Sequence, residues 1–270
     1  MSKIGRARLP FTTSLKVRLK AYLTYLSQNL TKLSLFPLTG CSKDNFSLIF
    51  TCIELLLDHQ PNLNLTESQD QDSVFTCLRT LIVSCLIPSE SLVPLVSKFL
   101  DQSPEVNHTN THQRTLLTYS VSMGDSRLDL TRLLLNHGSQ VVPAQSQRVR
   151  DRSAFTWLVH SVMSDRNKLS DFSATLELLC QNMVDTMGPQ DMREHVLSTF
   201  LHLGHNAGLQ GPLVKAMKLK VSAFWSQPRP LHTLCRKSIR QSLGPKNTSG
   251  GIEALRLPPS LSRYLHYNHF

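Results

Sequence analysis

Apolar residues recur three and four positions apart over much of the chain, the spacing that places them on one face of an α-helix. The pattern is clearest near the C-terminus, where the apolar positions are Leu231, Leu234, Cys235, Ile239 and Leu243. Pro230 suits the start of this helix, because the first turn does not need the N–H that proline lacks. The basic residues Arg236, Lys237 and Arg240 lie on its other face. So narrow an apolar stripe predicts packing into the groove of a partner or onto the body of the same domain.

A four-residue pattern occurs three times: Ser or Thr, then an apolar residue, then Phe or Leu, then Thr. The copies begin 42 and 38 residues apart, and each leads into an apolar segment and then a second leucine-rich segment. The copies are 73–76, 115–118 and 153–156, and the second segments are 92–100, 130–135 and 176–179. The Ser or Thr can cap a helix, and Gly138 can adopt a left-handed turn after the second copy. The pattern therefore predicts helical hairpins that repeat about every 35–40 residues.

These hairpins resemble the ankyrin repeat, whose units each pair two antiparallel helices. Thr115 takes the position of that family's helix-starting threonine, Leu117 that of its buried leucine, and Gly138 that of its turn glycine. The proline and histidine of the family pattern are replaced in all three copies. The resemblance implies an all-α fold, an ankyrin-like helical solenoid over residues 44–226 that binds a substrate. Leucine-rich helical hairpins of another type are the alternative.

Polar segments between the helical patterns are predicted to be loops. They are 61–72, 102–114, 143–152 and 163–171. Helical periodicity returns over 187–225, and two X-Pro steps within 227–230 then disfavour helix and mark a boundary. The Gly- and Ser-containing segment 244–251 predicts a flexible loop inside the last forty residues.

Two motifs beyond the boundary resemble the SOCS box, a short helical module that recruits a ubiquitin-ligase scaffold. The first helix of that family has Ser, Thr or Pro, then Leu, a Cys four residues on, and an apolar residue four further. Its second element has Leu-Pro-apolar-Pro followed by spaced apolar residues. In this chain the corresponding segment runs from Leu255 to Leu265, with Arg256 in place of the first proline. The resemblance implies a three-helix C-terminal module over 227–270.

The SOCS-box resemblance also implies two docking sites. The residues of the elongin C site are Pro230, Leu231, Leu234, Cys235 and Ile239. For a cullin they are Leu255, Leu257, Pro258, Leu261, Tyr264 and Leu265. The family's second element points to a cullin of the cullin-five type with its RING-finger protein, and elongin B accompanies elongin C. Arg256 departs from the family pattern and leaves the type of cullin open.

An ankyrin-like array followed by a SOCS box resembles the ankyrin-repeat and SOCS-box protein family. That resemblance implies a non-catalytic adaptor, which recruits a protein substrate to a cullin–RING ubiquitin ligase for ubiquitination and proteasomal degradation. The substrate has no signature in the sequence. The alternative function is an ankyrin-like interaction scaffold that recruits no ligase.

The net charge of +10 is unevenly distributed along the chain. Residues 1–43 carry eight Lys or Arg and no acid, residues 44–194 have a net charge of −7, and residues 195–270 have a net charge of +9. Two basic ends around an acidic middle argue against a continuous nucleic-acid footprint and are compatible with acidic protein partners. Periodic leucines predict that 1–43 is a basic helical segment, with a mitochondrial presequence as the alternative.

No catalytic, cofactor or metal site is predicted. His195, His202 and His205 are close in sequence, but no carboxylate or cysteine completes a ligand set at the usual spacing. Nucleophile-elbow, P-loop and dinucleotide-binding patterns do not occur. Cys235 is flanked by two cations but lies on the apolar stripe, so we expect a packing thiol rather than a nucleophile.

The cysteines and the apolar runs bear on where the protein resides. Six cysteines without a C-x-x-C pair, mostly in apolar segments, predict reduced and buried thiols in an intracellular protein. No apolar run reaches membrane-spanning length, so no membrane contact is expected. Together these features favour the cytoplasm, with the nucleus as an additional location left open.

Overall fold

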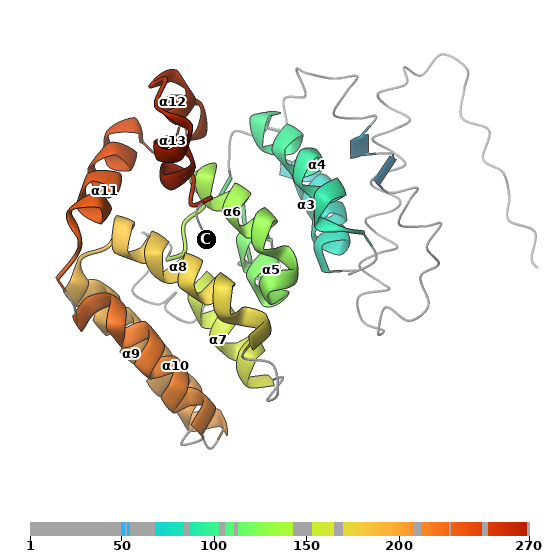
Figure 1. Cartoon of the computed structure of the whole chain (residues 1–270). Helices are drawn as coiled ribbons and strands as arrows, with labels where there is room; N and C mark the ends of the chain where they lie inside the picture. Colours follow the sequence, from blue (N-terminus) through green and yellow to red (C-terminus); the bar gives the residue numbers. More distant parts are fainter. Residues whose placement is uncertain are drawn as a thin grey trace, which may run out of the picture. The chain divides into compact units, whose positions relative to one another are not determined.

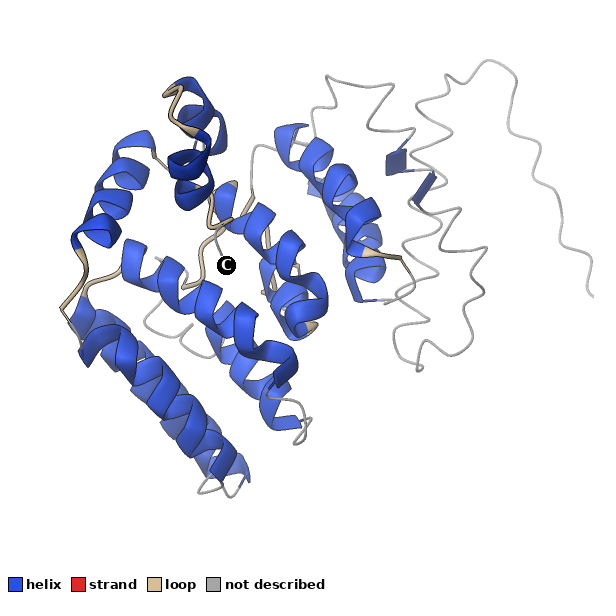
Figure 2. Ribbon diagram, viewed as in Figure 1, coloured by secondary structure: helices blue, strands red, loops and turns tan. Residues whose placement is uncertain are grey.

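In the computed structural model the regular secondary structure of the described residues is entirely helical, with loops between the helices and no strand (Figure 2). The described residues are 50–51, 53–54, 68–83, 87–102, 106–110, 113–142, 153–164, 170–207, 212–226, 228–244 and 248–268. The predicted basic segment 1–43 lies outside them, and so does the presequence alternative. No helix among the described residues has the length and apolar character needed to span a membrane.

The chain divides into two compact units. The first comprises residues 1–87 with 101–104, and the second comprises 88–100 with 105–270. The second unit contains both the repeated hairpins from 115 onward and the terminal module, so these two parts share one packed body.

The first unit contributes one long described helix, α3 (Ser68–Val83). Its buried side chains follow helical spacing and are Phe75, Leu78, Leu81 and Ile82. The loop predicted over 61–72 therefore ends earlier than expected. Ser73 lies inside α3 rather than at its start, so the predicted helix cap is wrong for this copy of the pattern.

The second copy of the pattern forms the predicted hairpin, α5 (Leu116–Ser122) and α6 (Leu128–Asn136), joined by the short helix η2 (Gly124–Arg127) (Figure 1). The Thr115 hydroxyl accepts the Thr118 N–H at 3.2 Å, and the Thr118 hydroxyl accepts the Thr115 N–H at 3.4 Å. This reciprocal capping box satisfies two N–H groups that the first helical turn leaves free.

A glycine turn ends α6, as the pattern predicts. Gly138 has φ +89°, and its N–H donates to the Leu135 carbonyl while the Ser139 N–H donates to the Leu134 carbonyl. These two bonds satisfy carbonyls at the end of the helix, and the positive φ is readily adopted only by glycine.

The third copy forms α7 (Ala154–Ser164) and α8 (Ser173–Thr186), with the short helix η4 (Ser170–Phe172) before α8. The Ser153 hydroxyl accepts the Thr156 N–H at 3.0 Å, so it caps α7 as predicted. The first helices α5 and α7 contact each other, and so do the second helices α6 and α8. The hairpins therefore stack side by side in two helical layers.

The remaining helices flank this stack. Helix α4 (Ser89–Gln102) precedes α5. It is bonded to η2, because the Arg127 guanidinium donates to the Ser89 hydroxyl at 3.2 Å. Beyond α8, the predicted periodicity over 187–225 forms α9 (Pro189–Ala207) and α10 (Pro212–Ser226), and both contact α8.

The described residues after the 227–230 boundary form three helices, α11 (Leu231–Leu243), α12 (Thr248–Ala254) and α13 (Pro259–Leu265). The flexible loop predicted over 244–251 is wrong from Thr248 onward, because Gly250 and Gly251 lie in α12, while Gly244 ends α11. A Cβ at Gly251 would approach the Leu243 Cδ2 atom to 2.8 Å. Glycine at this position therefore serves the close packing of α12 on α11 rather than flexibility.

We expect Thr115→Ala to lower the free energy of unfolding by about 1 kcal/mol, because the first turn of α5 loses its side-chain cap. Urea unfolding followed by circular dichroism measures the change. Thr115→Ser keeps a hydroxyl in the same position and is expected to unfold close to wild type. Equal destabilisation by both substitutions would contradict the capping role.

Candidate docking face of the C-terminal module

Helix α11 presents its apolar stripe to solvent and buries part of its basic face. Leu231 is 76% exposed and Leu234 is 44% exposed, whereas Arg236 is only 3% exposed. The apolar stripe is predicted to pack either into the groove of a partner or onto the body of the same domain. The second prediction is wrong for the N-terminal half of the stripe, which is exposed. The stripe is left available to a partner.

The buried end of Arg236 pairs with a carboxylate at the C-terminal end of α8. Its Nε atom donates to Asp185 Oδ2 at 2.8 Å, and its Nη2 atom donates to Asp185 Oδ1 at 3.4 Å. Both side chains are almost completely buried, at 3% and 2% exposure. A buried guanidinium is tolerable only with such a partner, because an isolated buried charge is strongly destabilising.

Further cations of this segment bond to carbonyls at the C-terminal end of α8 and just after it. Arg229 Nη1 donates to the Val184 carbonyl at 2.6 Å, and Lys237 Nζ donates to the Met187 carbonyl at 3.2 Å. Partial burial and the nearby Arg229 charge lower the pKa of Lys237. Cations at this position complement the negative end of the helix dipole, so the basic face of the segment binds the protein's own α8.

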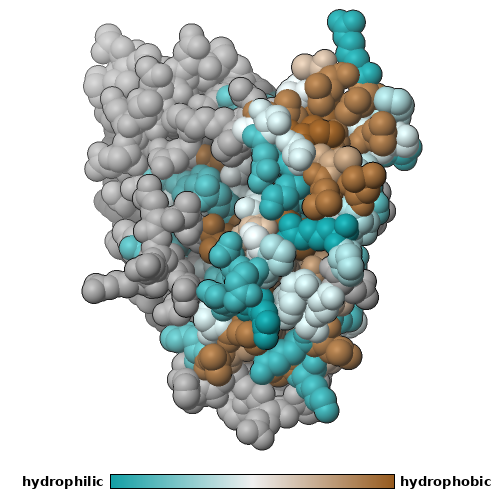
Figure 3. All heavy atoms as spheres, turned by 90° about the vertical axis from the view of Figure 1, so that its left-hand side faces the viewer, coloured by the Kyte–Doolittle hydropathy of each residue, from teal (hydrophilic) through white to brown (hydrophobic). Residues whose placement is uncertain are grey.

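We call the exposed apolar side chains Leu231, Leu234 and Cys235 the α11 ridge. Figure 3 shows hydrophobic atoms gathered over the upper part of the described surface, where α11, α12 and α13 lie in Figure 1. Pro230, which borders the ridge, is exposed, and Ile239 is half-buried. Four of the five predicted elongin C residues are therefore exposed on one side of the module.

The two cysteines with described side chains differ sharply. Cys180 is fully buried in α8, and burial raises the pKa of its thiol. Cys235 is exposed, so the prediction that the cysteines are buried is wrong for this residue. It lies on the ridge because one helical turn separates it from Leu231, while Arg236 occupies the buried side.

The second predicted docking element is only partly exposed. Leu255 is 45% exposed, Leu261 is 51% exposed, and Pro258 is also exposed. Leu257 and Tyr264 are half-buried. Leu265 is 3% exposed, so in the chain alone it packs into the protein's own interior.

The residue that departs from the family pattern also departs in backbone conformation. Arg256 has φ +48°, in the left-handed region. Proline, which the family has here, is restricted to a φ near −65° and cannot adopt this conformation. The path of this chain into the second element is therefore built for a residue other than proline.

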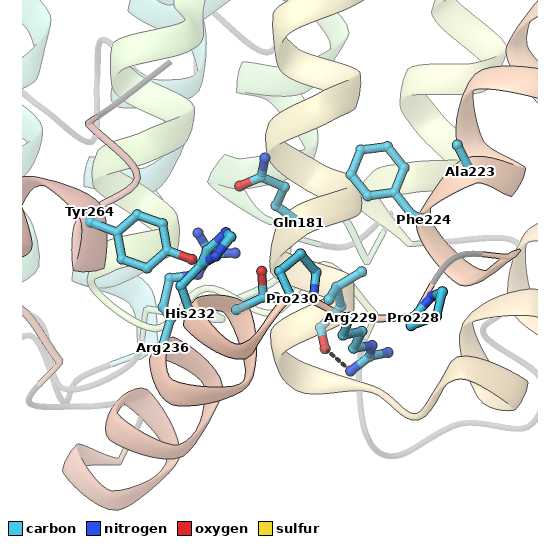
Figure 4. A pocket seen from close by; sticks show the side chains of 11 residues that line it. Gln181, Ala223, Phe224, Pro228, Arg229, Pro230, His232, Arg236 and Tyr264 are labelled. Atoms are coloured by element: carbon cyan, nitrogen blue, oxygen red, sulfur yellow. Dashed lines mark hydrogen bonds between the residues drawn. The ribbon is translucent and has the colours of Figure 1, made fainter.

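A cavity of about 430 Å³ lies beside the N-terminal end of α11. Its walls come from α8, α10, α11 and α13, and Figure 4 shows Gln181, Phe224, His232 and Tyr264 around it. The His232 and Tyr264 rings are 5.5 Å apart, edge to face. The cavity thus lies where the module meets the helical hairpins, next to Leu231.

Two of the three neighbouring histidines have described side chains, and these two differ in burial. His195 is buried, and its Nε2 atom is 3.0 Å from the Ser153 hydroxyl, whereas His202 is exposed. The side chain of His205 lies outside the described residues. Within the described part of the chain, no cluster of His, Cys, Asp and Glu could hold a metal ion.

The comparisons with known proteins identify the terminal module. Residues 227–266 match the SOCS box family, and the match does not extend to the helical hairpins. No curated protein and no solved structure matches the chain. The SOCS box is a module that generally binds elongins B and C and components of cullin–RING ubiquitin ligases, where it serves as a non-catalytic adaptor.

Proposed function

We propose that this protein is a substrate-recognition adaptor of an elongin B/C–cullin–RING ubiquitin ligase. The observation that supports it most is the orientation of α11 within the SOCS box. On its basic face Arg236 pairs with Asp185 and Lys237 donates to the Met187 carbonyl just after α8, while its apolar ridge is exposed. Burying a leucine side chain contributes roughly 1.5–3 kcal/mol, so this ridge has a strong tendency to bind an apolar groove.

Elongin C is the proposed occupant of the ridge, and elongin B joins through elongin C. Leu231 and Cys235 are one turn apart and enter the same pocket, where a small polarisable thiol packs well. Leu234 lies beside them, and Pro230 and Ile239 form the edges of the contact. The Cys235 thiol acts as an apolar anchor in this arrangement and carries out no chemistry.

A cullin is the proposed partner of the second element. The exposed residues of this element are Leu255, Pro258 and Leu261. The half-buried Leu257 and Tyr264 would contact the cullin through their exposed atoms. We favour the cullin-five type with its RING-finger protein. The left-handed backbone at Arg256 lies at the entry to this element, so Arg256 is the residue at which the choice of cullin would be altered.

The stacked hairpins from α5 to α10 are the proposed substrate-binding part, as ankyrin-like repeats acting in the cytoplasm and nucleus. Repeat arrays bind partners through extended surfaces of adjacent units. The adaptor itself makes and breaks no bond. It raises the effective concentration of substrate lysines near a ubiquitin-loaded enzyme, which accelerates transfer through proximity alone and leads to degradation of the substrate.

Introducing a charge into the ridge tests the proposal. We expect Leu231→Asp to abolish co-purification of elongins B and C with the full chain, because the carboxylate would have to be desolvated in an apolar pocket. Leu219→Asp is the matched control, since Leu219 on α10 is 74% exposed compared with 76% for Leu231.

The control variant is expected to retain both elongins. Two results would contradict the proposal: a wild-type chain that binds no elongin, or equal binding by the two variants. The first result would favour a scaffold that recruits no ligase.

A further inference from the structure

The chain continues beyond the SOCS-box match into a residue that is completely buried. The match ends at His266, and Tyr267 follows with 0% exposure, the largest of the fully buried side chains among the described residues. Tyr267 has φ +57°, which turns the backbone after α13. A bulky residue rarely adopts this conformation unless surrounding contacts enforce it.

The Tyr267 side chain lies among charged groups of α8 and α11. Its hydroxyl donates to Asp185 Oδ2 at 2.7 Å, the carboxylate oxygen that also accepts from Arg236. Its ring centre is 5.0 Å from the Arg236 guanidinium and 4.5 Å from the Arg240 guanidinium. One carboxylate of the hairpin stack thus binds the first helix of the module and a residue of the turn that follows its last helix.

The backbone at this turn is held as firmly as the side chain. Three successive carbonyls, those of Leu265, His266 and Tyr267, accept hydrogen bonds from side chains. The donors are Arg240 at 2.7 Å, Asn136 at 2.9 Å and Arg132 at 2.9 Å. Asn136 and Arg132 belong to α6, so the C-terminal turn is bonded to the second helices of both repeated hairpins.

We propose that Tyr267, with Asp185 and Arg236, forms a latch that fixes the direction of the SOCS box relative to the helical hairpins. Here Tyr267 is a positioning residue that touches neither elongin nor substrate. This inference rests on the proposed ligase function for its biological consequence, but the latch itself is a property of the chain alone.

The chemistry of the latch suits orientation better than bulk stability. Apolar packing tolerates small rotations between surfaces, whereas charge-assisted hydrogen bonds require defined distances and angles. A buried ion pair gains little net stability over apolar side chains of similar volume, and specificity of geometry is the role best attested for such pairs. In a ligase that works by proximity, a fixed direction limits which lysines come within reach of the bound enzyme.

A chain ending at His266 tests the latch, because it keeps the whole matched SOCS-box segment and loses Tyr267. Spin labels carried by non-canonical amino acids at Glu177 of α8 and Glu253 of α12, both exposed, report the distance between hairpins and module. We expect one narrow distance distribution in the wild-type chain and loss of that single peak in the shortened chain. Tyr267→Phe removes only the hydroxyl and its bond to Asp185, and we expect a distance distribution of intermediate width. Because this variant keeps the full chain, it tests the latch even where the shortened chain misfolds.

The functional measurement uses the reconstituted ligase with elongins B and C, cullin and RING-finger protein. Mass spectrometry of ubiquitin on the chain's own lysines is expected to show additional modified sites after truncation, with elongin affinity unchanged. Identical narrow distance distributions in all three chains would overturn the latch, and so would loss of elongin binding on truncation, since Tyr267 would then belong to the docking face. Failure of the ligase proposal appears separately, as a wild-type chain that binds no elongin while its distance distribution still depends on Tyr267.

Discussion

Replacing Asp185 with alanine is expected to lower the free energy of unfolding by about 3–5 kcal/mol, the cost of leaving a buried charge without its partner. Arg236 would remain 3% exposed with no carboxylate, and the Tyr267 hydroxyl would lose its acceptor. Urea unfolding, with circular dichroism and fluorescence as independent probes, measures the effect.

The chain contains a matched control for this prediction. Asp129 and Arg132 pair at 2.6 Å on α6, but the Asp129 side chain is 66% exposed. Arg132 is 13% exposed and keeps its bond to the Tyr267 carbonyl, so only the solvated Asp129 carboxylate is lost, and Asp129→Ala is expected to cost no more than about 0–1 kcal/mol. Similar losses for Asp185→Ala and Asp129→Ala would contradict the importance that we assign to burial of the first pair.

Removing both anchors of the α11 ridge is expected to weaken elongin binding far more than it affects folding. In Leu231→Ala/Cys235→Ala, the loss of about 2 kcal/mol for each anchor amounts to about 4 kcal/mol of binding free energy. This corresponds to roughly a thousandfold rise in Kd. The free energy of unfolding of the chain alone is expected to change little, because both side chains are exposed without a partner.

Titration calorimetry with purified elongin B/C complex measures this loss. Leu201→Ala/Leu219→Ala is the control, since these leucines of α9 and α10 are 68% and 74% exposed and lie outside the SOCS box. The control is expected to bind as wild type does. A ridge variant that unfolds more easily in the absence of elongins would show instead that the ridge supports the fold.

Local features were predictable from the sequence where a residue acts on its immediate neighbours. Thr115 and Ser153 cap their helices as their patterns indicate, and Gly138 adopts the left-handed turn. These effects depend on groups three or four residues away, so the sequence contains all the information that they require. Neither the hairpins nor their stacking establishes that they are ankyrin repeats, which stays a proposal.

Predictions based on composition alone were less successful. The glycines of 244–251 indicated a flexible loop, but Gly251 allows α12 to pack closely on Leu243. Ser73 matched the capping pattern, yet it lies within α3 because that helix begins earlier, at Ser68. For Gly251 the decisive information is what packs against the residue, and for Ser73 it is where the helix begins; local composition contains neither.

The sequence by itself determined that α11 has one apolar and one basic face, and that a SOCS-box pattern follows a set of helical hairpins. Only the tertiary structure decided which face of α11 is buried, because Arg236 is satisfied by a carboxylate 51 residues earlier in the chain. It likewise decided the importance of Tyr267, whose hydroxyl bonds to the same carboxylate 82 residues away. Helical spacing describes a single helix, whereas the burial of a charge depends on a partner that only the folded chain brings within hydrogen-bonding distance.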